Sequence, residues 1–567
     1  MTYKGVYRRV HNIAENLEAM NIPRNSRGLR IVGILCENRP EWLLTEFACI
    51  TRNIVTLGLY AVQSSDSVGK LLEDTEVACI CASAKYFQTL ITLKEKGFLS
   101  HLRIIIEIDN LLEEERRIFQ VPEIKFYSFR ELLKSTPKLS EPSKPSPDCI
   151  FTLCCTSGTT NSPKLAVITH RNMLGSLTSI IKGGYEFKSS DLCISYIPLA
   201  HLADRVVDYG IALGGGCLAF SSSDLVEFKH KIELHRPTIL FTVPRVLNVL
   251  HDQIKNTVAT KSKFKQRLFN ATLRSKIEAY ESKGTVKSSF WSNFAFKDCR
   301  LALGGRLRLV CTGTAPVNSE ILRFIRIVLG CAVIHGYGLV EASVASACSR
   351  QYDNSYGHVG GPLPCCEFKL DQGEICIRGH TVFPGYYNAP SHTLDSDGWL
   401  RTGDIGTFVG DRKALKIIDR ISNLVKLSNG AFVALESLEV AYQQSSFVSQ
   451  VMVYGDTEHS QIVGIVVPDQ KFVLKCWAPE NQIPETISFE EICNTQQLKS
   501  AILNDLDEIA KANDFCEYQK IRVVHLETSL WTPFNILTPT QKLKRSQAYD
   551  RYNEVINNLY QELSQIK

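Results

Sequence analysis

The first two thirds of the chain alternate short apolar runs with longer mixed segments. "LRIVGILC" (29–36) and "VACICAS" (77–83) are short and rich in β-formers, and "RPEWLLTEFACITRN" (39–53) between them has helical spacing. The same alternation recurs at 191–213 and at 307–338. Strands that alternate with helices predict βαβ units around a parallel sheet. We therefore expect an α/β fold for this large part of the chain.

The pattern changes toward the C-terminus. Short strands and turns, such as "QGEICIRG" and "ALKIIDR", fill the segment from about 360 to 420 and predict a β-rich subdomain. A further apolar run and an amphipathic helical segment then predict a small α+β unit. We expect a large domain over residues 1–420, including that subdomain, and a small, mobile C-terminal domain over 421–567.

Composition narrows the class of protein. The 567 residues are 44% hydrophobic and carry a net charge of only +5, which argues against a nucleic-acid binder. Nineteen cysteines without paired CxxC spacing indicate free thiols in a reducing compartment rather than a metal site. The apolar runs are shorter than the roughly 18 to 20 residues of a membrane span. We expect a soluble, cytoplasmic protein, with peripheral attachment to a membrane left open.

A basic segment lies in the middle of the chain, between residues 255 and 287. Its cations occur in a helical-looking stretch and outnumber the acids; they are Lys255, Lys261, Lys263, Lys265, Arg267, Arg274 and Lys276. Such a run is most often the solvated face of a helix. Contact with an anionic membrane surface is the functional alternative.

A polar loop, "TSGTTNSPK" (156–164), directly follows the apolar run "CIFTLCC". Hydroxyl groups, a glycine and a lysine in one turn after a strand suit phosphate binding, because backbone amides, hydroxyls and the lysine all face the anion. The loop is not the GxxxxGK[ST] motif. Taken alone, it fits an ordinary polar turn equally well.

The longer stretch "TSGTTNSPKLAVITHRN" resembles the signature phosphate loop of the adenylate-forming enzymes, the AMP-binding superfamily. Asn161 and Leu165 stand where glycines are usual. Further segments of that superfamily follow in its order, and they are "TGTAPV", "GYGLVE", "RTGD", "DRISNLVKLSNG" and "LTPTQKLKR". Val340 replaces the usual threonine in the second of these. Within the superfamily, the chain most resembles the long-chain fatty acid CoA ligases over nearly its whole length.

The resemblance implies a role for each matching residue. Phosphate binding is implied for Thr156, Ser157, Gly158, Thr159, Thr160 and Lys164, with Thr160 also catalytic. Adenine binding is implied for Gly313, Thr314, Ala315, Pro316, Gly336, Tyr337 and Gly338, and ribose binding for Asp404 and Arg420. Glu341 would hold Mg²⁺, Lys542 would be the mobile catalytic lysine, and Lys426 would face CoA. His201 would lie near the fatty carboxylate, although a core histidine bonded to a backbone carbonyl is an equal alternative.

The implied activity is ATP-dependent conversion of a long-chain fatty acid to an acyl-adenylate and then to acyl-CoA, with release of pyrophosphate and AMP. Fatty acid, ATP and CoA are then the partners and Mg²⁺ the cofactor. Two alternatives stay open. One is adenylation of another carboxylic acid, and the other is a non-catalytic homologue that binds nucleotide or acyl-CoA, which Asn161, Leu165 and Val340 motivate. The retained charged residues, among them Lys164 and Lys542, favour catalysis.

Overall fold

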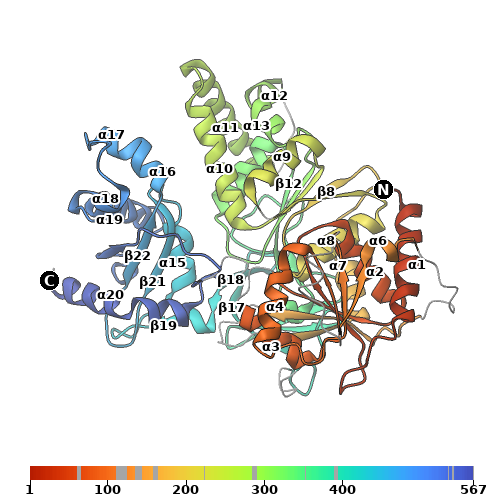
Figure 1. Ribbon diagram of the computed structural model, residues 1–567. Coiled ribbons are helices and arrows are strands. Elements are labelled where there is room, and N and C mark those ends of the chain that lie inside the picture. The colour runs from red at the N-terminus through yellow and green to blue at the C-terminus, as the bar shows by residue number, and fades with distance from the viewer. Residues whose placement is uncertain are drawn as a thin grey trace.

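The computed structural model describes residues 1–60, 65–109, 124–134, 144–156, 164–222, 224–283, 290–351, 353–387, 394–533, 535–538 and 542–565. Two large sheets with their helices make up the greater part of the molecule, and the C-terminal elements lie to one side (Figure 1). This is the α/β fold with a smaller α+β part that the sequence predicts. None of the helices in these residues is long and apolar enough to cross a membrane.

The first sheet has the strand order β5-β4-β3-β1-β2-β6-β7. Neighbouring strands are parallel except β7, which runs antiparallel to β6. Several strands, including β1 and β3, are buried along their whole length, as expected when helices cover both faces. The strands are β1 (Ile31–Leu35), β2 (Val55–Gly58), β3 (Cys79–Ala82), β4 (Ile104–Glu107), β5 (Lys125–Ser128), β6 (Ile150–Thr156) and β7 (Lys164–Thr169). The helices of this part are α1 (Tyr3–Ala19), α2 (Pro40–Thr51), α3 (Ser65–Thr75), α4 (Phe87–Glu95), α6 (Phe129–Leu132) and α7 (His170–Lys182).

The second sheet has the order β14-β13-β12-β11-β10-β8-β9. Its strands are β8 (Leu192–Ser195), β9 (Cys217–Phe220), β10 (Ile239–Thr242), β11 (Leu309–Thr312), β12 (Ala332–Tyr337), β13 (Ala347–Cys348) and β14 (Gly361–Pro362). Because β8, β10, β11 and β12 are parallel, their carboxyl ends share one edge, where α/β sheets bind ligands. The helices are α8 (Leu202–Leu213), α9 (Leu225–His235), α10 (Pro244–Ala259), α11 (Lys263–Lys283), α12 (Phe290–Ala295), α13 (Lys297–Ala302) and α14 (Ser319–Leu329). The basic segment is thus divided between two helices.

A four-stranded antiparallel sheet follows, in the segment for which the sequence predicts short strands and turns. It comprises β15 (Cys366–Asp371), β16 (Glu374–Gly379), β17 (Leu400–Val409) and β18 (Ala414–Arg420). Only Gln372 and Gly373 join β15 to β16, and both have positive φ (51° and 87°), as a two-residue hairpin loop of this kind requires. The β17–β18 register sets Asp404 opposite Arg420.

The C-terminal part packs helices on a three-stranded sheet of its own. A hairpin of β19 (Leu424–Lys426) and β20 (Phe432–Ala434) leads into it. The sheet has β21 (Val448–Tyr454), β22 (Val463–Pro468) and β23 (Val524–Leu526). The helices are α15 (Leu435–Tyr442), α16 (Gln470–Phe472), α17 (Ala478–Glu480), α18 (Phe489–Cys493), α19 (Gln496–Ala512) and α20 (Arg545–Gln565). Its apolar side chains form two clusters that contain no residue of the other sheets.

Candidate active site

A cavity of about 370 Å³ lies between the two large sheets, and residues from both line it. Thr156 at the end of β6 and Lys164 at the start of β7 come from the first sheet. Other lining residues lie at or just beyond the carboxyl ends of β10, β11 and β12. The volume is in the range of ordinary ligand pockets. The fold therefore brings the two ends of the polar loop, Thr156 and Lys164, to the same place as the "TGTAPV" and "GYGLVE" segments.

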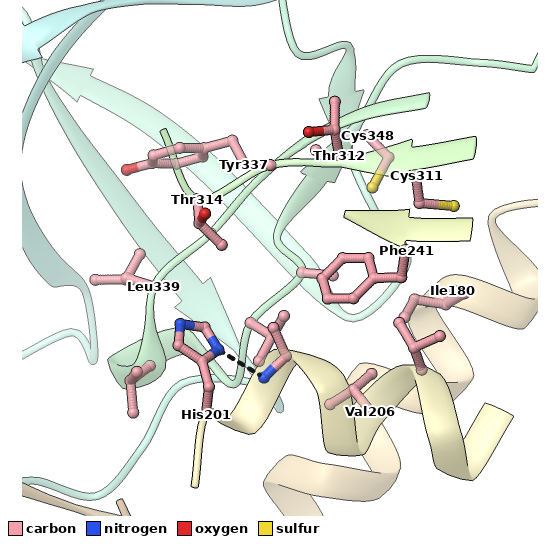
Figure 2. A pocket seen from close by; sticks show the side chains of 18 of the residues that line it. Ile180, His201, Val206, Phe241, Cys311, Thr312, Thr314, Tyr337, Leu339 and Cys348 are labelled. Atoms are coloured by element: carbon pink, nitrogen blue, oxygen red, sulfur yellow. Dashed lines mark hydrogen bonds between the residues drawn. The ribbon is translucent and has the colours of Figure 1, made fainter. Parts of the chain in front are cut away.

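One side of the cavity is apolar. Figure 2 shows Ile180, Val206 and Phe241 gathered on this side, with Tyr337 and Thr314 on the other. The remaining apolar lining includes Tyr185, Phe187, Val207, Ile239, Leu309, Cys311, Ile334, Ala345 and Cys348. Such a wall accepts a hydrocarbon group and offers it few polar partners.

The opposite side is polar, and two of its lining residues, Tyr337 and Arg420, contact the buried carboxylate of Asp404, which is not itself among the lining residues. The Tyr337 hydroxyl donates to Asp404 Oδ2 at 2.7 Å, and Arg420 Nε lies 3.1 Å from Asp404 Oδ1. Burial, reinforced by the charge of Asp404, holds the pKa of Tyr337 well above its usual range. Burial disfavours the charge on Arg420, but neighbouring carboxylates, Asp404 foremost, raise its pKa overall. The three residues thus form one hydrogen-bonded group beside the cavity, with Asp404 as its acceptor.

Glu341 lines the same cavity and is held by a residue that sequence reasoning missed. The Tyr386 hydroxyl donates to Glu341 Oε1 at 2.6 Å, and Lys164 Nζ lies 5.2 Å from the centre of the Tyr386 ring. Tyr386 is brought there by a bridge to Ala166 in β7. Because that contact spans 220 residues of sequence, no local pattern around Tyr386 could have indicated it.

His201 is the N-cap residue of α8, and its ring faces the cavity. Its Nδ1 accepts a hydrogen bond from the Ala203 amide at 3.2 Å (Figure 2). Burial, with the nearby charges of Arg205 and Lys542, lowers the pKa of His201 to about 4, so the ring is neutral near pH 7. The alternative for His201 was a core histidine bonded to a backbone carbonyl. The structure instead shows a histidine that lines the cavity and accepts a hydrogen bond from a backbone amide.

The loop that carries His201 is held in place by two hydrogen bonds to the side chain of Asn38. Its side chain donates to the Ile197 carbonyl at 2.7 Å and accepts from the Leu199 amide at 3.0 Å. These bonds cross from the first sheet to the loop after β8, and they are buried. The position of His201 is therefore set by packing between the two sheets.

Lys542 reaches the cavity from the C-terminal part of the chain. Its backbone amide donates to Thr538 Oγ1 at 2.9 Å. Burial lowers the pKa of Lys542. Arg545, the last residue of the "LTPTQKLKR" segment, is buried and pairs with Glu439 at 2.8 Å, so it ties α20 to α15.

Two backbone features shape the wall between these groups. A Cβ on Gly338 would lie 1.4 Å from the Val344 carbonyl oxygen, so only glycine fits there. Thr314 has φ 72°, a conformation that non-glycine residues seldom adopt and that is concentrated at functional sites. Both residues line the cavity.

Most of the predicted site residues that the structure describes come together, but not all. Gly313 and Gly336 line the cavity, whereas Ala315 and Pro316 continue the loop beyond Thr314 and are not among its lining residues. Lys426 lies away from it in β19, with Nζ 5.9 Å from the centre of the exposed Phe432 ring. The loop residues Ser157, Gly158, Thr159 and Thr160 lie outside the described residues, as does Asn161.

Comparison with known proteins agrees with this geometry. The sequence profile of the AMP-binding enzyme family matches residues 1–387. The chain is 35% identical to the peroxisomal long chain acyl-CoA synthetase 6 of Arabidopsis thaliana, over 94% of this chain and 78% of that protein. It is 32% identical to long-chain-fatty-acid--CoA ligase 5 of Mus musculus, over 99% of this chain and 85% of that protein.

Two solved structures share the fold. The adenylation domain of a carboxylate reductase from Mycobacterium chelonae superposes with a TM-score of 0.78 at 25% identity, over 99% of this chain and 84% of that one. The corresponding domain from Segniliparus rugosus was solved with AMP and a co-purified carboxylic acid. It superposes with a TM-score of 0.77 at 24% identity, over 99% of this chain and 87% of that one. The chain therefore belongs to the AMP-binding enzyme family. Within that family, it is similar to the long-chain acyl-CoA synthetases over nearly its whole length.

Proposed function

We propose that the protein activates a long-chain fatty acid with ATP and transfers the acyl group to CoA. The observation that carries this proposal is the composition of one cavity. An apolar wall built around Phe241 meets a polar end that holds Tyr337, Glu341 and Lys542. A hydrocarbon chain and a nucleotide would thus meet at one point, as formation of an acyl-adenylate requires.

In the first half-reaction, a carboxylate oxygen of the fatty acid attacks the α-phosphorus of ATP, and the bond to the departing pyrophosphate breaks. The two reactants repel each other, so the site must supply positive charge and hold them in line. Lys164 and Lys542 stand at the cavity to supply that charge. Tyr337 would stack on the adenine, and Asp404 would accept the ribose hydroxyls.

A magnesium ion fits the donor set around Glu341. Mg²⁺ is usually held by one or two carboxylates together with substrate phosphates, rather than by a cage of protein ligands. The described residues contain no cluster of three or more His, Cys, Asp or Glu side chains that could form such a cage. Glu341 is the carboxylate among the residues that line the cavity, so it would be the protein ligand of the ion. The ion, when bound, would screen the triphosphate charge, and the Tyr386 hydroxyl would orient the Glu341 carboxylate.

In the second half-reaction, the CoA thiol attacks the acyl carbon of the acyl-adenylate, and AMP leaves with the phosphate oxygen. Lys542 occupies the cavity, so we propose that residues 421–567 rotate about Ser422 to withdraw it before CoA binds. Ser422 lies in a single turn, Ile421–Asn423, between β18 and β19. Lys426, exposed on β19, would then face CoA.

The apolar wall supports a long-chain substrate. Each methylene buried against it contributes about 0.8 kcal/mol, so a longer chain gains more until the wall ends. The side chains of Tyr185, Phe187, Cys311 and Cys348 line this part of the cavity. We propose that they set the length of the acyl chain.

Mass spectrometry of the reaction products tests the proposed function. The purified protein is given ATP, Mg²⁺, CoA and fatty acids from short to very long, and acyl-AMP and acyl-CoA are measured. Acyl-CoA with a maximum at a long chain length is the expected result. A maximum at a short or aromatic acid would favour a different substrate. Nucleotide binding without either product would favour the non-catalytic homologue that Asn161, Leu165 and Val340 motivate.

We also propose that the protein works in the cytoplasm and contacts a membrane peripherally. All nineteen cysteines are free thiols, which suits a reducing compartment. The proposed substrate is an amphiphile that dissolves in bilayers.

A further inference from the structure

We propose that α11 and α12 present a docking surface for a membrane that carries anionic lipids. This α11–α12 surface consists of Lys263, Phe264, Lys265, Arg267, Arg274, Phe290, Trp291 and Phe294. The proposal rests on the proposed function for its purpose, since a long-chain fatty acid resides in bilayers. Its physical basis is independent of that function and comes from charge, exposure and placement in the fold.

The positive charge of the chain is concentrated in this segment. Residues 255–276 contain seven lysines and arginines and no acid, whereas the whole chain has a net charge of only +5. Lys263, Lys265, Arg267 and Arg274 are exposed on α11. Within the described residues, none of these four side chains is paired with a carboxylate. Lys261, by contrast, lies 3.3 Å from Asp298.

Large aromatic side chains stand beside these cations and face outward. Phe264 is 72% exposed, and on α12 Phe290, Trp291 and Phe294 are 78%, 60% and 55% exposed. The last three follow the spacing i, i+1 and i+4, which places them on one side of the helix, while Ser292 is buried on the other. Exposed aromatics grouped on one helix face mark a site of interaction rather than ordinary surface.

The helices α11 and α12 pack against each other, so the exposed cations and aromatic rings lie on adjacent helices. The Phe269 ring of α11 lies 5.1 Å from the Phe296 ring between α12 and α13, and both are buried. The Lys261–Asp298 ion pair joins the segment just before α11 to α13. Figure 1 shows α10 to α13 standing out together from the second sheet, away from α1 and α2.

Cations with exposed Trp and Phe match the interface of an anionic bilayer. Lysine and arginine attract the headgroups, and the aromatic rings enter the boundary between headgroups and acyl chains. Nucleic acids also attract cations. The exposed aromatic face of α12 favours lipid, because it offers a hydrocarbon layer more contact than it offers a phosphate backbone.

Co-sedimentation with phosphatidylcholine vesicles, with and without phosphatidylserine, tests the surface. The full chain should bind the phosphatidylserine vesicles, and added salt should weaken the binding. The triple variant Lys263→Glu/Lys265→Glu/Arg267→Glu should bind about a hundredfold more weakly, since each cation contributes about fivefold near such a membrane. The variant Phe290→Ser/Trp291→Ser/Phe294→Ser should also bind more weakly but should keep the salt dependence of the unaltered chain, because its cations remain.

A matched control changes the net charge equally elsewhere. Lys413, Lys471 and Lys475 are exposed and lie outside the α11–α12 surface. The variant Lys413→Glu/Lys471→Glu/Lys475→Glu should keep vesicle binding within a few-fold of the unaltered chain. Tryptophan fluorescence gives a local readout, because Trp291 is the exposed tryptophan and its emission should shift to shorter wavelength on vesicles. Trp291→Phe should abolish that shift.

The proposal is overturned if the unaltered chain binds vesicles with and without phosphatidylserine equally, or if both charge variants bind the phosphatidylserine vesicles alike. Binding to RNA or DNA in place of vesicles would assign the surface to nucleic acid. A separate assay of acyl-CoA synthesis, with fatty acid delivered on albumin and no vesicles, tests the proposed function independently of membrane binding. Vesicle binding without synthesis would refute only the function, and synthesis without vesicle binding only the surface.

Discussion

Replacement of Lys542 by alanine should separate the two half-reactions. Lys542 reaches the cavity from the C-terminal part of the chain, at the end where the phosphates would lie. One positive charge about 4 Å from a developing negative oxygen, at an effective dielectric of about 20, contributes about 4 kcal/mol. Adenylation should therefore fall by roughly a thousandfold. Thioester formation from supplied acyl-adenylate should keep most of its rate, because Lys542 would have left the site by then.

Rapid-quench measurement of acyl-AMP from ATP and fatty acid follows the first step, and CoA added to synthetic acyl-AMP follows the second. Lys544→Ala is the matched control, because Lys544 is two residues away and is not among the cavity residues. It should leave both rates within a few-fold. Equal loss of both half-reactions in Lys542→Ala would refute the assigned role.

The same lysine predicts a pH dependence. Burial lowers the pKa of Lys542, so the charged form is lost at a lower pH than in a free lysine. The value of kcat/KM for adenylation, which reports the free enzyme, should fall on the alkaline side as Lys542 loses its proton. In Lys542→Ala, the decline of kcat/KM at alkaline pH should disappear. If the decline persisted, it would be due to another titrating group.

Three further changes test the surrounding structure. Tyr386→Phe removes the hydrogen bond to Glu341 and should raise the Mg²⁺ concentration for half-maximal adenylation by about 10- to 100-fold, and an unchanged requirement would contradict the assigned contact. Gly338→Ala places a Cβ 1.4 Å from a carbonyl oxygen, so nucleotide affinity measured by calorimetry should collapse even if the protein folds. Arg545→Ala leaves Glu439 buried without its partner and should lower the free energy of unfolding by about 3 to 5 kcal/mol, whereas replacing both residues by methionine should recover most of that loss in a denaturation assay.

Several elements could be predicted from the sequence because their signals are local. The run "LRIVGILC" forms β1, and "RPEWLLTEFACITRN" forms α2, since apolar periodicity and a proline at the first turn are properties of adjacent residues. The motif segments share this character, because each consists of consecutive residues.

Contacts between distant segments were decided only by the tertiary structure. Tyr386 meets Glu341 across 45 residues, and Arg545 pairs with Glu439 across 106, so neither pairing leaves a local pattern. Arg545 looks like a surface charge in "KLKR", yet folding buries it. The sequence by itself determined which chemical groups the protein carries and which strands and helices they follow. The packing of two sheets and a C-terminal part, driven by burial of apolar faces, decided which of those groups share one cavity.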